Sequence, residues 1–296
     1  MAGVHVVAAI DRCPVATTTY KANFPDTIVI RKSLERVVLS DLKQKIGPID
    51  ILLASPECTN HTCAKGAAPR NEASRATAMQ LVRFARAFRP RWIVLENVVH
   101  MRPWRRYGEL KNSLQRLGYN LAEQVLDSSD FGVAQRRRRL FLVGDRKAQP
   151  RIARAPRGPK KSARSILDPA GLWATTPLFI PGRATGTIDR ARRAFESLGK
   201  RSSFLLVYYG TDGGGGWQPL DRPLRTVTTI DRFALVESRS GQPRIRMLQV
   251  SELKRAMGFA ESYKLESGTR RDKIRLLGNG VCPPVMRAVI ESLLAD

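Results

Sequence analysis

Short, fully apolar runs alternate with helical patterns along the first half of the chain. Residues 49–55 (IDILLAS) and 91–98 (RWIVLENV) are apolar on both faces, and 74–88 between them has the spacing of an amphipathic helix. An apolar run at 5–11 is likewise followed by a helical pattern at 14–24. Strands of this kind, joined by helices, are typical of parallel sheets covered on both faces. The sequence therefore predicts an α/β fold with a doubly wound, mostly parallel sheet.

The composition changes near residue 148, where a segment rich in Pro, Arg and Lys begins. Short β-like pieces among Gly and Pro turns follow, and helical patterns return at the end of the chain. We predict a first domain at 1–150, a smaller, irregular β-containing domain at 151–250, and helices at 251–296 that return to the first domain. The glycine-rich run at 210–219 lacks a flanking strand and helix, so it predicts a flexible loop rather than a phosphate-binding one.

Basic residues greatly outnumber acidic ones. There are 51 Lys and Arg against 26 Asp and Glu, giving a formal net charge of +25, which predicts a polyanionic partner. Nucleic acid fits better than an acidic membrane, because the arginines are spread through a globular pattern and no amphipathic anchor accompanies them. No apolar run reaches roughly 18 residues and no secretion signal begins the sequence, so we expect a soluble protein.

The cysteines do not form a recognisable framework. Cys13, Cys58, Cys63 and Cys282 match neither a set of disulfides nor the paired spacing of a zinc site, and there are three histidines. We therefore expect a reducing, cytoplasmic setting and no metal site.

Two chemically active side chains follow predicted strands. Cys58 lies just past 49–55 and Glu96 lies at the end of 91–98. If the strands are parallel neighbours, both side chains open onto one crevice at the carboxyl edge. A thiol and a carboxyl facing one pocket form a nucleophile and an acid, and an apolar site favours a protonated acid. The alternatives are a small buried Cys58 and a Glu96 that caps the next helix; Cys63 is more typical of a buried residue.

Four consecutive arginines, Arg136 to Arg139, precede the apolar run LFLVG. Such a run is usually a solvated loop or a nucleic-acid patch. Because it enters a strand, Arg137 and Arg139 share one side while Arg136 and Arg138 share the other. One pair can therefore reach the pocket.

Four motifs, in this order, carry a resemblance to a known family. They are SPECTNHT at 55–62, LENV at 95–98, QRRRRLF at 135–141 and LGNGVCPPV at 277–285. Over nearly its whole length the chain resembles a DNA (cytosine-5)-methyltransferase of the bacterial and phage type, an enzyme class found in restriction-modification systems.

The resemblance implies a mechanism in which the target cytosine is flipped out of double-stranded DNA. Cys58 adds to C6 of the base, Glu96 bonds N3 and the exocyclic amine, and C5 takes the methyl group of S-adenosyl-L-methionine. Arg139, and to a lesser extent Arg137, hold the base carbonyl and the nearby backbone. The region 151–250 corresponds to the target-recognition domain.

The resemblance also implies cofactor and DNA contacts. Asp11 matches the acidic residue that accepts hydrogen bonds from the cofactor ribose. The implied cofactor-binding residues are Asp11, Arg12, Ser33, Leu34, Asn279 and Val281. The implied DNA-binding residues are Gln135, Arg136 and Arg138.

Three departures from the family stand out. The glycine loop that cradles the methionine part of the cofactor is absent, and residues 1–11 align with the strand after it. Either the start lies inside a longer reading frame or the first strand is lost, so we expect an uncovered position in the sheet. Glu57 replaces the usual proline before Cys58 and disfavours its thiolate unless it points outward. Ser33 replaces an acidic residue near the adenine amine.

Three functions remain open on this sequence. A cytosine-5 DNA methyltransferase is the leading hypothesis. Thiol addition at C6 also activates C4, so a homologue unable to hold the methyl donor could act as a cytosine deaminase. An inactive DNA-binding or base-flipping homologue is the third. We expect a monomer, or one completed by a separate chain that supplies the missing strand.

Overall fold

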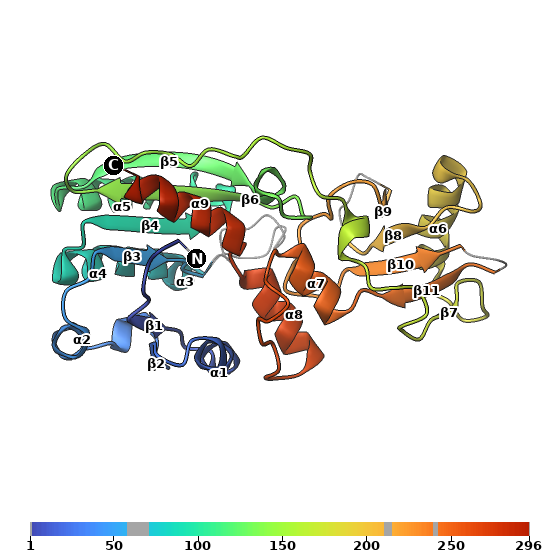
Figure 1. Ribbon diagram of the computed structural model, residues 1–296, viewed down its shortest axis with the longest axis horizontal. Helices are drawn as coiled ribbons and strands as arrows, with labels where there is room; N and C mark the ends of the chain where they lie inside the picture. Colours follow the sequence, from blue (N-terminus) through green and yellow to red (C-terminus); the bar gives the residue numbers. More distant parts are fainter. Residues whose placement is uncertain (1, 58–70, 210–214, 239–241, 296) are drawn as a thin grey trace. The chain divides into compact units, whose positions relative to one another are not determined.

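The computed structural model describes residues 2–57, 71–209, 215–238 and 242–295. They divide into two compact units (Figure 1). Unit 1 consists of Met1–Asp127, Arg138–Pro156 and Pro283–Asp296, and unit 2 of Ser128–Arg137 and Arg157–Cys282. The composition change near residue 148 lies close to the boundary after Pro156. The segments 128–137 and 251–282, however, belong to unit 2, so only the final helix returns to unit 1.

Strands and helices alternate through the first part of unit 1, as the apolar runs predicted. The strands are β1 (Ala8–Ile10), β2 (Ile28–Ile30), β3 (Ile51–Ala54), β4 (Trp92–Asn97), β5 (Asn120–Asp127) and β6 (Arg138–Asp145). The helices are α1 (Pro14–Asn23), α2 (Leu39–Ile46), α3 (Glu72–Ala76), α4 (Gln80–Phe88), α5 (Tyr107–Arg116) and α9 (Pro283–Leu294). Single 3-10 turns are η1 (Leu34–Arg36), η3 (Thr77–Met79) and η4 (Val99–Met101).

Helix α4 shows how the sequence encodes these elements. Leu81, Ala85 and Phe88 recur every three to four residues and are all buried, as expected of the inward face of an amphipathic helix. The helix ends at Arg89, whose φ of 48° is left-handed and whose backbone N–H donates to the carbonyl of Ala85 at 2.9 Å. This is the usual way to close the last turn, although glycine is the residue that favours it.

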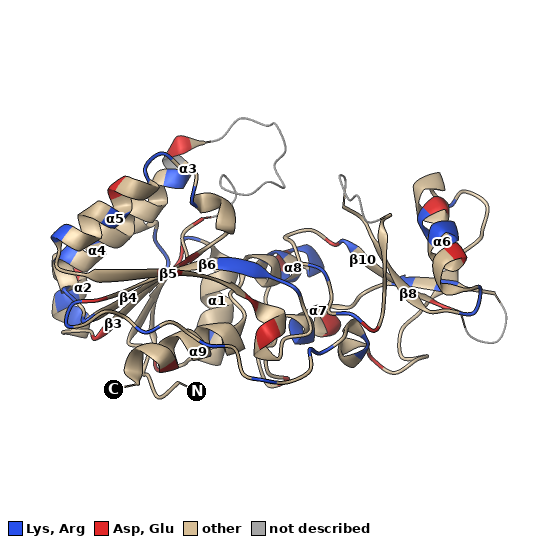
Figure 2. Ribbon diagram, turned by 90° about the horizontal axis from the view of Figure 1, so that it is seen from above, with Lys and Arg blue, Asp and Glu red and all other residues tan. Residues whose placement is uncertain are grey.

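The main sheet has the strand order β3-β4-β6-β5. β3 and β4 are parallel, but β6 is antiparallel to both β4 and β5. β3, β4 and β5 therefore run in one direction and β6 is the reversed strand of this sheet, because β5 and β6 are joined through 128–137 rather than by a crossover helix. The expected mostly parallel sheet is confirmed. Helices α4 and α5 cover one face and α9 lies over the other (Figures 1 and 2), so the sheet is doubly wound.

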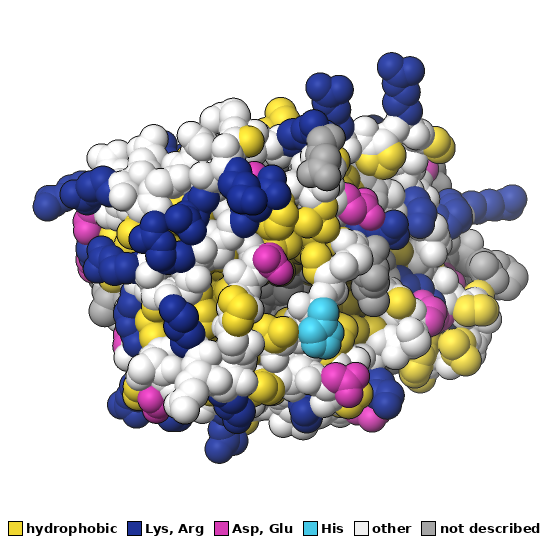
Figure 3. Space-filling view, turned by 60° about the vertical axis from the view of Figure 1, so that its left-hand side comes forward, with side chains coloured by type: hydrophobic (Ala, Val, Ile, Leu, Met, Phe, Trp, Pro, Cys, Tyr) yellow, Lys and Arg dark blue, Asp and Glu magenta, His cyan; other side chains and the backbone are white. Residues whose placement is uncertain are grey.

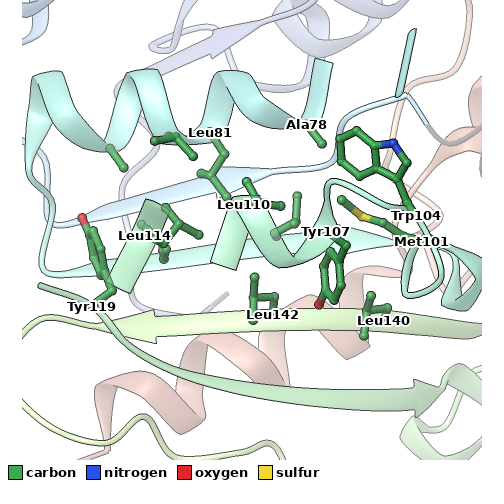
Figure 4. Close-up of a cluster of buried hydrophobic side chains, with 14 residues drawn as sticks. Ala78, Leu81, Met101, Trp104, Tyr107, Leu110, Leu114, Tyr119, Leu140 and Leu142 are labelled. Atoms are coloured by element: carbon green, nitrogen blue, oxygen red, sulfur yellow. The ribbon is translucent and has the colours of Figure 1, made fainter. Parts of the chain in front are cut away.

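The core under α4 and α5 is continuous with the sheet. Leu81 of α4 and Leu110 and Leu114 of α5 pack with Leu140 and Leu142 of β6 (Figure 4). Leu110 and Leu114 are fully buried, and truncating such a side chain to Ala costs about 2–5 kcal/mol. This packing fixes the strands whose ends carry the candidate site.

The strands of unit 1 form two sheets, not one. β1 and β2 pair in parallel with each other only, separately from the sheet that begins at β3. Both sheets nevertheless contribute to one hydrophobic cluster, through Ile10, Ile30 and Leu52. The sequence predicted an uncovered position in the sheet without locating it, and the division between β1-β2 and the sheet that begins at β3 agrees with that expectation.

Unit 2 is built on an antiparallel sheet with the order β7-β11-β10-β8-β9. Its strands are β7 (Thr176–Pro177), β8 (Phe204–Val207), β9 (Trp217–Pro219), β10 (Phe233–Glu237) and β11 (Arg244–Met247). Its helices are α6 (Thr185–Leu198), α7 (Val250–Ala256) and α8 (Arg270–Asn279), with 3-10 turns η5 (Ser128–Phe131) and η6 (Ala163–Ile166). Ala191 and Ala194 of α6 pack on Phe204 and Leu206 of β8. The α/β class with a smaller β-containing part is confirmed.

Within the described ranges, every helix is too short or too polar to cross a membrane.

Candidate active site

The ends of β3 and β4 lie side by side, as predicted for neighbouring parallel strands. Ser55 directly follows β3, and its hydroxyl donates to Oε2 of Glu96 at 2.6 Å. Cys58 comes three residues later and lies outside the described residues, as does Cys63. The placement of Glu96 at the carboxyl edge of this sheet is thus the part of the predicted pair that the structure describes.

Glu96 is also contacted by Arg139, the second residue of β6. Since β6 is antiparallel to β4, its beginning lies beside the end of β4, with Phe141 opposite Glu96. Nε of Arg139 is 3.2 Å from Oε1 of Glu96, and the two side chains are only 15% and 5% exposed. Glu96 is therefore half of a nearly buried ion pair. The contact agrees with the expectation that one pair of the arginine run reaches the pocket, and it gives Glu96 a charged partner rather than wholly apolar surroundings.

Asn97, the next residue, fixes the chain that leads to Cys58. It is 1% exposed, its Nδ2 donates to the carbonyl of Pro56 at 3.2 Å, and its Oδ1 accepts from the N–H of Val98 at 2.8 Å. The roles of Asn97 and Ser55 were not predicted. Both residues lie in quoted motifs, however: Asn97 follows Glu96 in LENV, and Ser55 is the first residue of SPECTNHT.

Arg137 has a different environment from Arg139. It precedes β6, belongs to unit 2 and is 3% exposed. It donates to the carbonyls of Val227 at 2.9 Å, Gly278 at 2.6 Å and Gly280 at 3.0 Å. These bonds join three segments within unit 2. The described contacts thus give Arg137 a positioning role, and its contact with a base stays a prediction.

The other residues of the arginine run alternate in burial. Arg136 and Arg138 are exposed, in line with a surface that meets DNA. Gln135 is 0% exposed; its Nε2 donates to the carbonyl of Ala256 at 3.1 Å, and its Oε1 accepts from the N–H of Val227 at 2.7 Å. The expected DNA contact of Gln135 is corrected, because a fully enclosed side chain with both ends bonded presents nothing to a surface.

The predicted cofactor residues of unit 1 follow two paired strands. Asp11 comes directly after β1, and Ser33 and Leu34 follow β2, so parallel pairing places them at one edge. Oδ1 of Asp11 accepts the N–H of Cys13 at 2.7 Å. Within the described ranges no other group bonds this exposed carboxylate. Asp11 therefore keeps acceptor capacity for hydroxyl donors.

Arg12 is paired with the residue that departs from the family. Its Nη2 is 3.0 Å from Oε2 of Glu57, with side chains 71% and 32% exposed. The carboxylate of Glu57 is thus directed at a guanidinium, which offsets its negative charge beside Cys58. The contact also shows that the carboxyl ends of β1 and β3 lie at the same edge of unit 1.

Asn279 and Val281 belong to unit 2. Asn279 is the last residue of α8 and is exposed, and Val281 follows it half-buried. The predicted cofactor set is therefore divided between the two units.

A carboxylate held by an arginine lies at the carboxyl edge of a doubly wound sheet, next to the stretch that leads to a cysteine, which is the arrangement that the motifs predicted for an α/β enzyme. The chain belongs to the C-5 cytosine-specific DNA methylase family, whose sequence profile matches residues 1–172 and 187–295. The predicted family and the enzyme class, a DNA (cytosine-5)-methyltransferase, are confirmed.

Relatives of known identity are bacterial type II methyltransferases. The chain is 25% identical to M.XorII of Xanthomonas oryzae pv. oryzae over 97% of its length and 79% of the relative. It is 29% identical to M1.HphI of Haemophilus parahaemolyticus over 99% of its length and 82% of the relative. Among solved structures, the Dnmt2 methyltransferase of S. pombe aligns with a TM-score of 0.70 at 18% identity, covering 99% of this chain and 92% of the other, which shows the shared fold.

Proposed function

We propose that this chain methylates C5 of a flipped cytosine in double-stranded DNA, using S-adenosylmethionine. The observation that carries the proposal is the Glu96–Arg139 ion pair with Ser55, set where β3 leads toward Cys58. Glu96 bonds N3 and the exocyclic amine of the base, and Arg139 holds both Glu96 and the base carbonyl. The exposed Arg136 and Arg138 contact the DNA backbone.

The electron flow needs one nucleophile and one proton acceptor. The Cys58 thiolate forms a bond to C6 and breaks the C5=C6 double bond, which makes C5 nucleophilic. When bound, S-adenosylmethionine supplies the methyl group. Loss of the C5 proton to a base then restores the double bond and expels the thiolate. Glu96 stabilises the charge that develops on the ring while Cys58 is attached.

The residues present fit the nucleoside part of this cofactor. Asp11 has acceptor capacity for the ribose hydroxyls, and Ser33 and Leu34 lie at the end of the neighbouring strand. Asn279 and Val281 are included on the strength of the family motif.

We further propose that a strand from a separate polypeptide completes the sheet of this otherwise monomeric protein. The evidence is two open backbone edges. Val7 and Asp11 bond β2, through Ile28 N–H to Val7 C=O at 3.1 Å and Asp11 N–H to Ile30 C=O at 3.2 Å. Alternate residues of a parallel strand bond the same neighbour, so the amides and carbonyls of 8 and 10 point away from β2.

β3 also has alternate residues whose backbone groups point away from its paired strand. Trp92 N–H donates to the carbonyl of Asp50 at 2.9 Å, so the even-numbered residues bond β4 and the backbone of Ile51 and Leu53 faces the other way. Nothing in the described ranges bonds these edge groups. Leu53 is also 41% exposed. Unpaired edges invite strand addition, and the exposed leucine indicates an apolar occupant.

Methyl transfer is tested with a labelled donor and cytosine-containing duplex. We expect label on the DNA from the unaltered chain and none from Cys58→Ser, with Glu96→Gln at least a hundredfold slower, because removing preorganised stabilisation typically costs about 10²–10³. Uracil formed without donor would instead indicate a deaminase. Tight DNA binding with neither product would indicate an inactive homologue.

Strand addition is tested by amide hydrogen exchange. A synthetic peptide with a Val-rich strand and flanking lysines should protect the amides of 8, 10, 51 and 53, whereas the same peptide with proline in its centre should not, since proline lacks the N–H donor. Equal protection by both peptides, or by neither, contradicts the proposed edge.

A further inference from the structure

A second concave site lies at the amino ends of the strands of unit 1. Its volume is about 450 Å³, and its lining includes Asp50 before β3, Arg89, Arg91 and Trp92 around the start of β4, and Arg146 and Lys147 after β6. Trp92 and Glu96 are four residues apart on one strand, about 13 Å at the usual rise. The pocket is therefore distinct from the candidate active site.

The lining carries four cations and one carboxylate, Asp50. Arg89, Arg146 and Lys147 make no ion pair within the part of the chain that the structure describes. Arg146 instead uses Nη1 to donate to the carbonyl of Arg89 at 3.0 Å, which holds two of the cations together. Basic residues border this end of β3 and β4 in Figure 2. Gathering uncompensated like charges in a hollow is unfavourable unless an anion enters it.

The nearby carboxylate of Asp145 does not supply that anion. It accepts from Nε1 of Trp92 at 2.8 Å and from the N–H of Lys147 at 2.7 Å, and Nε of Arg91 lies at 3.5 Å. Burial raises the pKa of Asp145, but these hydrogen bonds and the Arg91 charge outweigh it, so the pKa lies below its usual value. Arg91 is also stacked 4.0 Å from the centre of the Trp92 ring. Trp92 and Arg91 are thus held in place, and the carboxylate of Asp145 is already bonded to its neighbours.

Arg89 occupies a backbone position that suits glycine. It is the one non-glycine residue with positive φ in the described ranges. A left-handed conformation costs a residue with Cβ roughly 1–2 kcal/mol. A guanidinium at this strained position, at the rim of the pocket, is in line with a use for its charge.

We propose that this pocket binds a phosphate group, carried either by a free nucleotide or by the backbone of nucleic acid. Guanidinium forks match phosphate oxygens in pairs, and the ammonium of Lys147 adds a point charge. The volume exceeds that of one phosphate and leaves room for the sugar to which it is attached. The site goes beyond the proposed methyl transfer and does not depend on Glu96 or Cys58.

Figure 3 shows why a matched control is needed: Lys and Arg side chains are spread over the face in view, with hydrophobic side chains between them. The full chain is titrated calorimetrically with inorganic pyrophosphate and, separately, with a short DNA duplex. The test variant is Arg89→Gln/Lys147→Gln. The control is Lys45→Gln/Arg86→Gln, which removes the same charge from two exposed residues of unit 1 outside the pocket.

We expect the pocket variant to bind at least tenfold more weakly, since each lost charge-assisted bond is worth about tenfold or more, and the control to stay within about twofold. Weakening for pyrophosphate identifies a nucleotide-type ligand, and weakening for the duplex alone identifies a nucleic-acid backbone. Equal weakening in both variants, or no binding of either probe, overturns the proposal. Lys147→Gln alone, with the melting temperature measured, guards against misfolding of the double variant.

Discussion

Replacing Arg139 by methionine tests the central contact of the candidate site. The change removes the guanidinium that lies 3.2 Å from Glu96 and leaves a carboxylate, 4% exposed, with the Ser55 hydroxyl as its remaining described donor. Breaking a buried ion pair on one side costs about 3–5 kcal/mol. Because Arg139 itself is 15% exposed, water can partly reach the gap. We therefore expect the low end, about 3 kcal/mol, or roughly a hundredfold in the unfolding equilibrium.

The second arm of the test neutralises both partners. In Glu96→Gln/Arg139→Met no buried charge is stranded, so we expect stability within about 1 kcal/mol of the unaltered chain. The two single variants and the double variant form a double-mutant cycle, with a coupling energy of about 2 kcal/mol or more. The free energies come from urea unfolding followed by circular dichroism, with the slopes compared to check that the transition is unchanged.

Arg138→Met is the matched control. It removes the same charge from the adjacent, exposed residue of β6 and should change stability by less than about 0.5 kcal/mol. The reasoning is refuted if Arg139→Met is no more destabilising than this control, or if the double variant is as unstable as the single one. Either result would mean that Glu96 is solvated well enough not to need its partner.

Three further perturbations have defined outcomes. Gly278→Ala places a Cβ on the backbone carbonyl of Thr228, so the melting temperature should fall by several degrees, and an unchanged value contradicts that packing. Asp145 has a lowered pKa, so its ionised form stabilises the folded chain. This contribution is complete above the usual pKa of 3.8 and is lost as the pH falls through the folded-state pKa. Asp145→Asn should therefore make the free energy of unfolding less dependent on pH below about pH 4. The exposed Arg12–Glu57 pair contributes about 0–1 kcal/mol to stability. Arg12→Gln should nevertheless slow alkylation of Cys58, and Glu57→Gln should speed it. Equal alkylation rates in the two variants exclude charge compensation.

The position of Glu96 could be predicted from the sequence, because neighbouring parallel strands end at the same edge of a sheet. Two apolar runs separated by one helix had to place their carboxyl ends together, and Glu96 therefore met the end of β3. Arg139 could be placed only on a side of its strand. Its contact with Glu96 depends on β6 being antiparallel to β4. The residue pattern of 138–146 predicts a strand but does not indicate whether that strand is parallel or antiparallel to its neighbour.

Other features depend on distant contacts that local pattern does not contain. Gln135 looks like a surface residue beside four arginines, but it is enclosed by Val227 and Ala256, more than 90 residues away in sequence. Strand β5 (NLAEQVLD) carries charged and amide side chains that mask its pairing with β6. An uncovered position in the sheet was expected from the absent glycine-loop segment, but its place beside β1 and β3 follows from the strand pairing in the structure.

The two inward arginines show how one short motif serves two structural tasks. Arg137 donates to three carbonyls of unit 2, and Arg139 pairs with Glu96 in unit 1, although one residue separates them. The chain passes from one unit to the other between 137 and 138. A guanidinium presents five N–H donors in one rigid plane, which suits it to bonding several fixed acceptors in set directions. The alternation that turns both side chains inward therefore anchors the chain on each side of the boundary, while Arg136 and Arg138 beside them are exposed.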